Sequence, residues 1–168
     1  QKTPHGIGQL GPAHNLTIDE DARQYAAIQE YYRKQTRLGI PAIHHDEAAH
    51  GFMRNQANSF PAPIGIACTW NPDLLRRIYT QAAHEARSRG ISQVLSPVVD
   101  VARDPRWGRV DETLGEDPFL VGRLGAAMVE GLQGSADGTI ADGHVAATLK
   151  HFAGYGATIG GRNRAPYP

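Results

Sequence analysis

Hydrophobic and polar positions along this chain follow two different periods, which predict helices and strands in turn. Over Asp19–Arg37 a shared face recurs every three to four residues, the spacing of a helix, and Gly39 is predicted to end it. Thr17 and Glu20 stand at the spacing of a capping box, which is typical of a helix start. The face consists of Ala22, Tyr25, Ala26, Gln29 and Tyr32.

Two further helices are predicted where an N-cap residue is followed by proline. Asn71 with Pro72 and Asp117 with Pro118 both combine a capping side chain with a residue suited to the first helical position. Gly90 is predicted to end the first of these helices. The apolar positions of the two segments are Leu74, Leu75, Ile78, Ala82 and Ala86, then Leu120, Leu124, Met128 and Leu132.

Short runs rich in apolar and β-branched residues lie between these helices and predict strands. They are Ile40–His45, Ile91–Val99 and Val145–Leu149, and residues 6–10 favour a further short strand within an extended N-terminal segment. Strands that alternate with helices at this spacing are typical of parallel βα units. Ionisable residues follow the three longer runs, so parallel strands would bring them to one edge of the sheet. The pattern therefore predicts an α/β fold, an incomplete (β/α) barrel.

Three loops are predicted between these elements. Residues 58–70 read as a proline-punctuated loop with a brief apolar run, and residues 135–143 read as a polar loop. The third, Asp100–Pro118, holds the highest density of charges of both signs. Such a stretch suits a plain solvated loop. Trp107 favours the alternative of a rigid turn around a buried ring, whose face can also stack on a flat partner such as a sugar.

Length, charge and cysteine content limit the size of the domain and the classes of partner that the chain can bind. The 168 residues suffice for one domain but fall short of a full eightfold barrel, which takes roughly 250 residues. Lys and Arg balance Asp and Glu at 17 each, so no general attraction to nucleic acid or anionic membrane is expected, and a small neutral partner is favoured. The single cysteine, Cys68, reads as a core residue. No apolar run is long enough to span a bilayer, and the sequence leaves localisation open.

Histidines and carboxylates crowd the segment His44–His50, which raises the question of a metal site. The spacing departs from HExxH, because Asp46 stands where the first histidine of that motif belongs. On a strand, His44 and His45 would also point to opposite faces. Neither a metal nor another cofactor is therefore expected, although a metal-dependent hydrolase remains an alternative class.

Several longer motifs together resemble the N-terminal part of glycoside hydrolase family 3, the β-glucosidase and β-xylosidase group. They are RLGIP at 37–41, EAAHG at 47–51, FPAPIGIACTWNP at 60–72, SPVVDVARDPRWGRVDETLGEDP at 96–118 and ATLKHFAGYG at 147–156. The resemblance spans most of the chain. It implies roughly the first half of a (β/α)8 TIM-type barrel, as a single incomplete domain over residues 1–168. It also implies an exo-acting retaining β-glycosidase that acts on terminal β-D-xylosyl or β-D-glucosyl residues.

The resemblance further implies that Glu47, Arg109, Lys150 and His151 bind sugar hydroxyls at the cleavage subsite. The structural alternative pairs Arg109 with a nearby glutamate and leaves the lysine in solvent. Supporting roles are expected for the turn residues and pairing partners around these four, namely His50, Asp104, Arg106, Trp107 and Glu112. The loop at 160–164 lacks a phosphate-loop signature and reads as a flexible loop.

No catalytic residue is expected within this chain. A retaining glycosidase needs a nucleophile and an acid/base with carboxyl groups roughly 5 to 5.5 Å apart, and the resemblance implies that both lie on later segments. The expected partners are a neutral oligosaccharide or aryl glycoside, the rest of the barrel, and a C-terminal domain. An open barrel edge would favour association. A non-catalytic carbohydrate-binding fragment is therefore the other alternative class.

Glu47 bears on the choice of sugar. Many β-glucosidases of the family carry aspartate at this motif position, whereas its β-xylosidases carry glutamate. The longer glutamate reaches into the space of a glucose hydroxymethyl group, which xylose lacks. The resemblance thus implies a preference for β-xylosides with secondary activity on β-glucosides.

Overall fold

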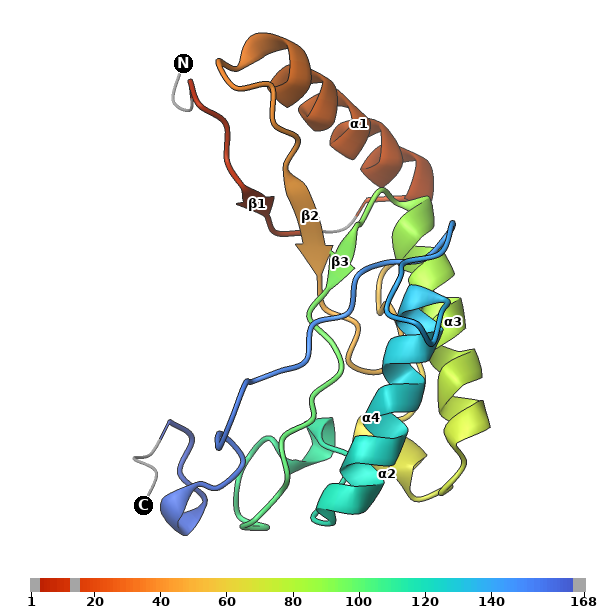
Figure 1. The fold of residues 1–168 in the computed structure, drawn as a ribbon, viewed down its shortest axis with the longest axis vertical. Coiled ribbons are helices and arrows are strands. Elements are labelled where there is room, and N and C mark those ends of the chain that lie inside the picture. The colour runs from red at the N-terminus through yellow and green to blue at the C-terminus, as the bar shows by residue number, and fades with distance from the viewer. Residues whose placement is uncertain (1–3, 13–15, 165–168) are drawn as a thin grey trace.

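A computed structural model describes residues 4–12 and 16–164, and its centre is a parallel sheet (Figure 1). The strands β1 (Gln9–Leu10), β2 (Ile43–Asp46) and β3 (Gln93–Val94) lie in the order β1-β2-β3. Both pairings are parallel, with His45 opposite Gln93. The predicted parallel βα arrangement is therefore confirmed, and the loops after β2 and β3 run to the same end of the sheet.

Helix α1 (Ile18–Gln35) connects β1 to β2 and begins at the predicted capping box. The Thr17 backbone N–H donates to Glu20 Oε2 at 2.8 Å, and the Thr17 hydroxyl accepts from the Glu20 N–H. The helix ends at Gln35, before Gly39, so the predicted end is too late. Ala26 is exposed, which corrects the predicted face: one step of about 100° from buried Tyr25 turns it away from the sheet.

β2 begins three residues later than the sequence predicts because Ala42 is already hydrogen-bonded elsewhere. The Gln29 side chain accepts from the Ala42 N–H at 3.0 Å and donates to the Ala42 carbonyl at 2.6 Å. Pro41 has no N–H to donate to a neighbouring strand. The first residue free to join the sheet is therefore Ile43, whose N–H donates to the Gly8 carbonyl.

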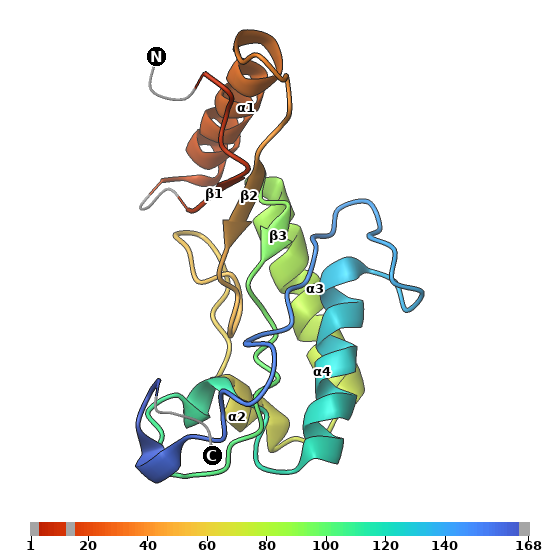
Figure 2. The same ribbon diagram turned by 60° about the vertical axis from the view of Figure 1, so that its left-hand side comes forward.

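Helices α3 (Pro72–Ser88) and α4 (Pro118–Gln133) pack side by side and form the core with β3 (Figures 1 and 2). Their predicted caps are present: Asn71 accepts from the Leu74 N–H and Asp117 from the Phe119 N–H. Leu75, Ile78, Ala82 and Ala86 of α3 and Leu124, Met128 and Leu132 of α4 are buried, as the apolar pattern predicts. The two helices with the clearest local signals thus hold the core.

The predicted strand Ile91–Val99 is shorter than expected, because only Gln93–Val94 forms β3. The predicted strand Val145–Leu149 runs beside it but makes only isolated parallel bridges, Gln93 to Ala146 and Val98 to Lys150. Four residues lie between the bridged positions on the first segment and three on the second, so one extra residue interrupts the ladder. The interruption falls at Pro97, which cannot donate a hydrogen bond. Lys150 is the last bridged residue, and His151 follows it directly.

A short helix and two 3-10 turns occupy stretches that were predicted as loops. Helix α2 (Pro63–Ala67) begins with proline at its first turn, and η1 (Val110–Glu112) and η2 (Ile159–Gly161) follow later in the chain. Cys68, predicted to be a core residue, is exposed at the end of α2. Within the described ranges no helix is long and apolar enough to cross a membrane.

Candidate active-site cleft

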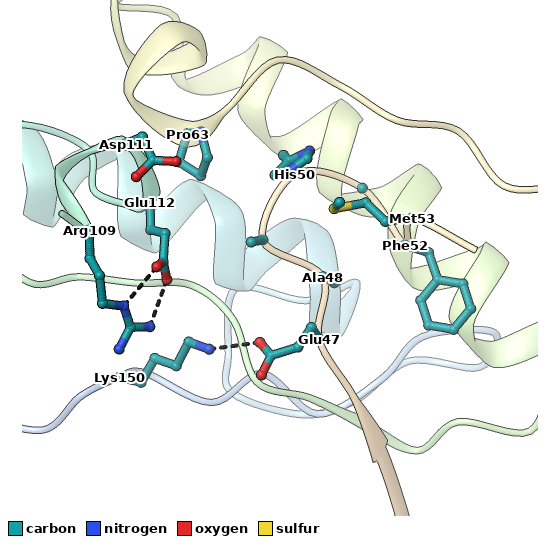
Figure 3. A pocket seen from close by; sticks show the side chains of 12 residues that line it. Glu47, Ala48, His50, Phe52, Met53, Pro63, Arg109, Asp111, Glu112 and Lys150 are labelled. Carbon is teal, nitrogen blue, oxygen red and sulfur yellow. Dashed lines mark hydrogen bonds and ion pairs between the residues drawn. The ribbon is translucent and has the colours of Figure 1, made fainter. Parts of the chain in front are cut away.

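A cleft of about 330 Å³ opens at the end of the sheet where β2 and β3 terminate (Figure 3). Glu47 follows β2, Arg109 and Glu112 come from the long loop after β3, and Lys150 is the last residue of the paired segment 145–150. His151 adjoins this group through Arg109. We call Glu47, Arg109, Lys150 and His151 the rim cluster. The structure thus brings together all four residues expected to bind sugar.

Lys150 and Glu47 pair across the cleft although they are far apart in the sequence. Lys150 Nζ donates to Glu47 Oε2 at 2.7 Å (Figure 3). The Lys150 side chain is only 14% exposed and that of Glu47 is 60% exposed, so the carboxylate is the more open partner. This pair places a donor and an acceptor next to each other at the mouth of the cleft.

Arg109 and Glu112, which also line the cleft, form a two-point ion pair. Arg109 Nε and a terminal guanidinium nitrogen each lie 2.7 Å from a Glu112 carboxylate oxygen. These hydrogen bonds lower the pKa of Glu112 below its usual range and raise the pKa of Arg109. The pair of Arg109 with a nearby glutamate, which the sequence offers as the structural alternative, is therefore present. The terminal nitrogen that binds Glu112 also lies 3.1 Å from His151 Nε2, and the other terminal nitrogen lies 3.5 Å from the Tyr155 hydroxyl.

His151 joins the rim cluster to the sheet behind it. Its Nδ1 lies 2.7 Å from Asp100 Oδ2, and its Nε2 lies 3.1 Å from a terminal nitrogen of Arg109. The ring also meets the Tyr155 ring edge to face, with centroids 4.9 Å apart. His151 is thereby fixed by contacts on three sides.

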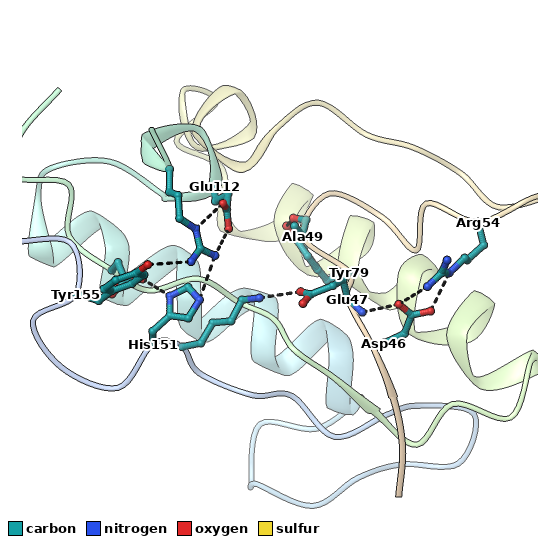
Figure 4. Close-up of polar contacts among 11 residues, drawn as sticks. Asp46, Glu47, Ala49, Arg54, Tyr79, Glu112, His151 and Tyr155 are labelled. Atoms are coloured by element: carbon teal, nitrogen blue, oxygen red, sulfur yellow. Dashed lines mark hydrogen bonds and ion pairs between the residues drawn. The ribbon is translucent and has the colours of Figure 1, made fainter. Parts of the chain in front are cut away.

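The loop that carries Glu47 is anchored at several points behind the cleft (Figure 4). Arg54 donates to both carboxylate oxygens of Asp46 at 2.8 and 2.7 Å, and Asp46 also accepts from the Glu47 N–H. Burial raises the pKa of Asp46, although Arg54 acts in the opposite direction. The buried Tyr79 hydroxyl donates to the Ala49 carbonyl at 2.6 Å. These contacts fix the backbone of Glu47 while its carboxylate stays open.

His50 ties the two ends of the same loop together. Its Nδ1 lies 3.1 Å from the Phe60 carbonyl oxygen, and the Phe60 N–H donates to the His50 carbonyl at 2.9 Å. His50 also lines the cleft. Its geometry is that of a residue that shapes the turn around Glu47.

The turn at 104–107 packs around Trp107, which is buried at 2% exposure, as predicted. Arg106 pairs with Asp104 through contacts of 2.9 and 2.6 Å, which lower the pKa of Asp104 to about 2. Trp107 Nε1 donates to Asn163 Oδ1 at 3.2 Å, and the Tyr155 hydroxyl donates to the same oxygen at 2.5 Å. The loop at 160–164, read from sequence as flexible, therefore packs on the turn that precedes Arg109.

The sequence reasoning missed four residues that shape the cleft: Asp46, Asp100, Tyr155 and Asn163. Asp46 and Asp100 directly follow or end apolar runs at the predicted edge of the sheet, which is a usable signal. Tyr155 and Asn163 carry no local signal, because their roles depend on contacts with residues about a third of the chain away. Among residues 4–12 and 16–164, no group of three or more His, Cys, Asp and Glu side chains is arranged to hold a metal ion.

The parallel βα units and the polar cleft at their strand ends define the class of protein: an α/β fold that forms part of a TIM-type barrel. Residues 3–168 match the glycosyl hydrolase family 3 N terminal domain. The chain belongs to glycoside hydrolase family 3.

Similar proteins include enzymes named for both sugars. A β-xylosidase from Formosa agariphila is 40% identical over 83% of this chain and 20% of its own length. A β-glucosidase structure from Erythrobacter marinus is 42% identical with a TM-score of 0.93, over 98% of this chain and 22% of its own. A β-glucosidase from Listeria innocua in complex with glucose is 39% identical with a TM-score of 0.80, over 92% of this chain and 20% of its own. The chain spans about a fifth of the length of the curated relatives it matches.

Proposed function

We propose that this chain forms the sugar-binding wall of the cleavage subsite in an exo-acting retaining β-glycosidase. The substrates are oligosaccharides or aryl glycosides that end in a β-D-xylosyl or β-D-glucosyl residue. The observation that carries the proposal is the convergence of Glu47, Arg109 and Lys150 on one cleft from three separate parts of the chain, with His151 beside them through Arg109. The names of the similar proteins, β-xylosidases and β-glucosidases, support this substrate class.

The charge balance of the wall suits a neutral polyhydroxylated ligand. Lys150 and Arg109 are matched by Glu47 and Glu112 in pairs of 2.7 Å, and Asp111 adds one further carboxylate to the lining. Each sugar hydroxyl can both donate and accept, and the cleft offers donors and acceptors side by side. An anionic ligand would instead need a surplus of positive charge, which the lining of the cleft does not offer.

The bond-breaking carboxyl groups are assigned to parts of the enzyme outside these 168 residues. Glu47, Glu112 and Asp100 are each engaged by a basic side chain, namely Lys150, Arg109 and His151 respectively. We accordingly interpret residues 1–168 as one incomplete domain, the N-terminal part of the family's barrel, which works together with the remaining barrel and a further domain.

The preference for xylose is proposed to depend on the reach of Glu47. Its backbone is fixed by Asp46, so shortening the side chain withdraws the carboxylate instead of moving the loop. In the complete glycosidase, Glu47→Asp is expected to shift relative efficiency from aryl β-xyloside toward aryl β-glucoside by roughly tenfold, within the 10- to 200-fold that one small group is worth.

Comparison of kcat/KM on both aryl glycosides tests this assignment. Glu30→Asp, which shortens an exposed glutamate paired with Lys34 on α1, is the matched control and leaves the ratio unchanged. A wild-type enzyme that strongly favours glucosides, or a Glu47→Asp variant with an unshifted ratio, removes Glu47 from this role. Absence of hydrolysis of any β-glycoside by the complete chain overturns the proposed function itself.

A further inference from the structure

Asp100 is a buried carboxylate that contacts the rim cluster without belonging to it. Its side chain is only 2% exposed, and its Oδ2 lies 2.7 Å from His151 Nδ1. We propose that Asp100 is a positioning residue that fixes His151 as a hydrogen-bond acceptor toward Arg109 and the pocket that Arg109 and His151 line beside the cleft. One particular sugar hydroxyl would then act as the hydrogen-bond donor to His151. This inference rests on the proposed function and names the residue that sets the polarity of its binding wall.

The contacts on the two sides of the His151 ring determine where its proton lies. An ionised carboxylate only accepts hydrogen bonds, so the nitrogen facing Asp100, Nδ1, carries the proton. A guanidinium only donates, so the nitrogen facing Arg109 at 3.1 Å, Nε2, carries a lone pair. The two contacts are mutually consistent only for an imidazole with its single proton on Nδ1.

Asp100 and His151 are held together by the sheet rather than by a mobile loop. Val98 and Lys150 are bridged in parallel, and the Val99 N–H donates to the Lys150 carbonyl at 2.9 Å, so the residues that follow lie side by side. The backbone at Gly156, five residues after His151, packs closely against Asp100 and Val101. Only glycine fits there, because a Cβ would lie 2.4 Å from the Val101 carbonyl oxygen and 3.2 Å from Asp100 Cβ. Backbone pairing therefore sets the position of Asp100 next to His151 Nδ1, where the proton lies.

The consequence for binding is a wall of defined hydrogen-bonding polarity. Arg109 and Lys150 donate, whereas Glu47 and His151 Nε2 accept. A hydroxyl that replaces the direct 3.1 Å contact between Arg109 and His151 would accept from the guanidinium and donate its own proton to Nε2. Without Asp100 the proton of His151 is free to move to Nε2, where it would face the guanidinium and the hydroxyl hydrogen.

A double-mutant cycle in the complete glycosidase tests whether Asp100 acts through His151. Asp100→Ala is expected to lower kcat/KM on an aryl β-glycoside at least tenfold, but less than twofold further when His151→Ala is already present. An equal fall in both backgrounds would show that Asp100 has a merely structural role. Asp100→Asn, which has the same shape, takes the place of the alanine variant in the cycle if the latter does not fold.

Asp21→Asn serves as the matched control for the cycle. Asp21 is also a buried acid paired with a basic side chain, Arg89 at 2.9 Å, but it lies on α1, away from the cleft. Its substitution is expected to lower Tm and to have the same relative effect on kcat/KM with and without His151. Coupling of Asp21 to His151 as strong as that of Asp100 would contradict the inference.

Deoxyfluoro derivatives of xylose and glucose test the predicted polarity directly, because fluorine can accept a hydrogen bond but cannot donate one. At one ring position, replacing the hydroxyl by fluorine is expected to raise the inhibition constant about tenfold in the wild type, and less than twofold in His151→Ala. Equal sensitivity in both enzymes would overturn the assignment of His151 as an acceptor. Inactivity of the wild type on all β-glycosides is a separate outcome, which would refute the proposed function first.

Discussion

Arg109 combines a structural and a ligand-binding position in one side chain. Two of its nitrogens bind Glu112, while its terminal nitrogens also face His151 at 3.1 Å and the Tyr155 hydroxyl at 3.5 Å. Its guanidinium carbon lies 5.4 Å from the centre of the Tyr155 ring. The planar group is thus oriented before any ligand arrives, so little conformational entropy is lost on binding.

Removal of either cation of the rim cluster is expected to impair catalysis more than folding. In the complete glycosidase, Lys150→Ala and Arg109→Ala should each raise the transition-state barrier by about 1 to 3 kcal/mol, because the sugar hydroxyls and the partner carboxylate lose their donor. Measurement of kcat/KM together with Tm separates the two effects. Lys34→Ala, which removes an exposed lysine from α1, is the control. Unchanged efficiency in both cleft variants would exclude these residues from binding.

The ion pair of Glu112 predicts a specific acid sensitivity. Because hydrogen bonds from Arg109 lower the folded-state pKa of Glu112 below the usual 4.5, the stabilisation is fully present above pH 4.5. It is lost as pH falls through the lowered value. Glu112→Gln should therefore have a lower Tm than wild type near neutral pH, and the two curves should converge in acid. A difference in Tm that stays constant across the acid range would contradict the pairing.

Sequence separation decided which of the site residues were predictable. Glu47, Arg109, Lys150 and His151 lie within the motifs that carry the family resemblance, so the resemblance could name each of them. The residues that support these four side chains could not be named from the sequence. The His151 contact with Asp100 spans 51 positions, that of Arg109 with Tyr155 spans 46, and that of Trp107 with Asn163 spans 56. Only the folded chain brings such pairs together.

At the scale of elements, the helices were predicted more accurately than the strands for a physical reason. A helix start depends on its own capping residue, and Thr17, Asn71 and Asp117 all act as caps. A strand end depends on its neighbours. The side chain of Gln29 delays β2, and an extra residue near Pro97 interrupts the pairing after β3. Neither effect is visible in the hydrophobic pattern of the strand itself.

The turn at 104–107 and the turn at 158–161 support the cleft as one packed unit. A Cβ added to Gly161 would lie 2.6 Å from Arg106 Cβ and 2.7 Å from the Arg106 carbonyl carbon, which is backbone and cannot move aside cheaply. The adjacent Gly160 has a similar left-handed conformation, with φ of 63° against 72°, but no atom lies within 4 Å of its added Cβ. A substitution at Gly160 therefore tests backbone strain alone, whereas the same substitution at Gly161 tests strain and close contact together.

Alanine at these two positions should have unequal effects in the complete glycosidase. Gly160→Ala is expected to cost about 1 to 2 kcal/mol of stability from the left-handed conformation alone. Gly161→Ala should cost about 1 to 3 kcal/mol more from overpacking and should also raise KM, because Arg109 follows the displaced turn. Denaturant unfolding and steady-state kinetics measure both effects. Equal stability of the two variants would show that the turns are not tightly packed.

At the scale of the whole molecule, the sheet is open on the side of residues 145–150. Leu149 is 59% exposed there and borders an apolar groove of about 470 Å³ along α4, which Gly122, Ala126 and Val129 also line. Exposed apolar surface of this kind promotes association. In the proposed complete enzyme, the remaining strands and helices of the barrel would cover it.

The isolated 168-residue chain is therefore expected to associate and to hydrolyse no glycoside. Its apolar groove and open strand edge should produce concentration-dependent oligomers in light scattering and binding of a hydrophobic dye. Leu149→Ser should reduce both signals. Ile40→Ser is the matched control: Ile40 is also 59% exposed but precedes β2, away from the groove, so its substitution should have less effect. A monomer that binds no dye would show that the groove needs no covering. Measurable turnover by the chain alone would place both catalytic carboxyl groups within it, because the retaining mechanism requires the two together.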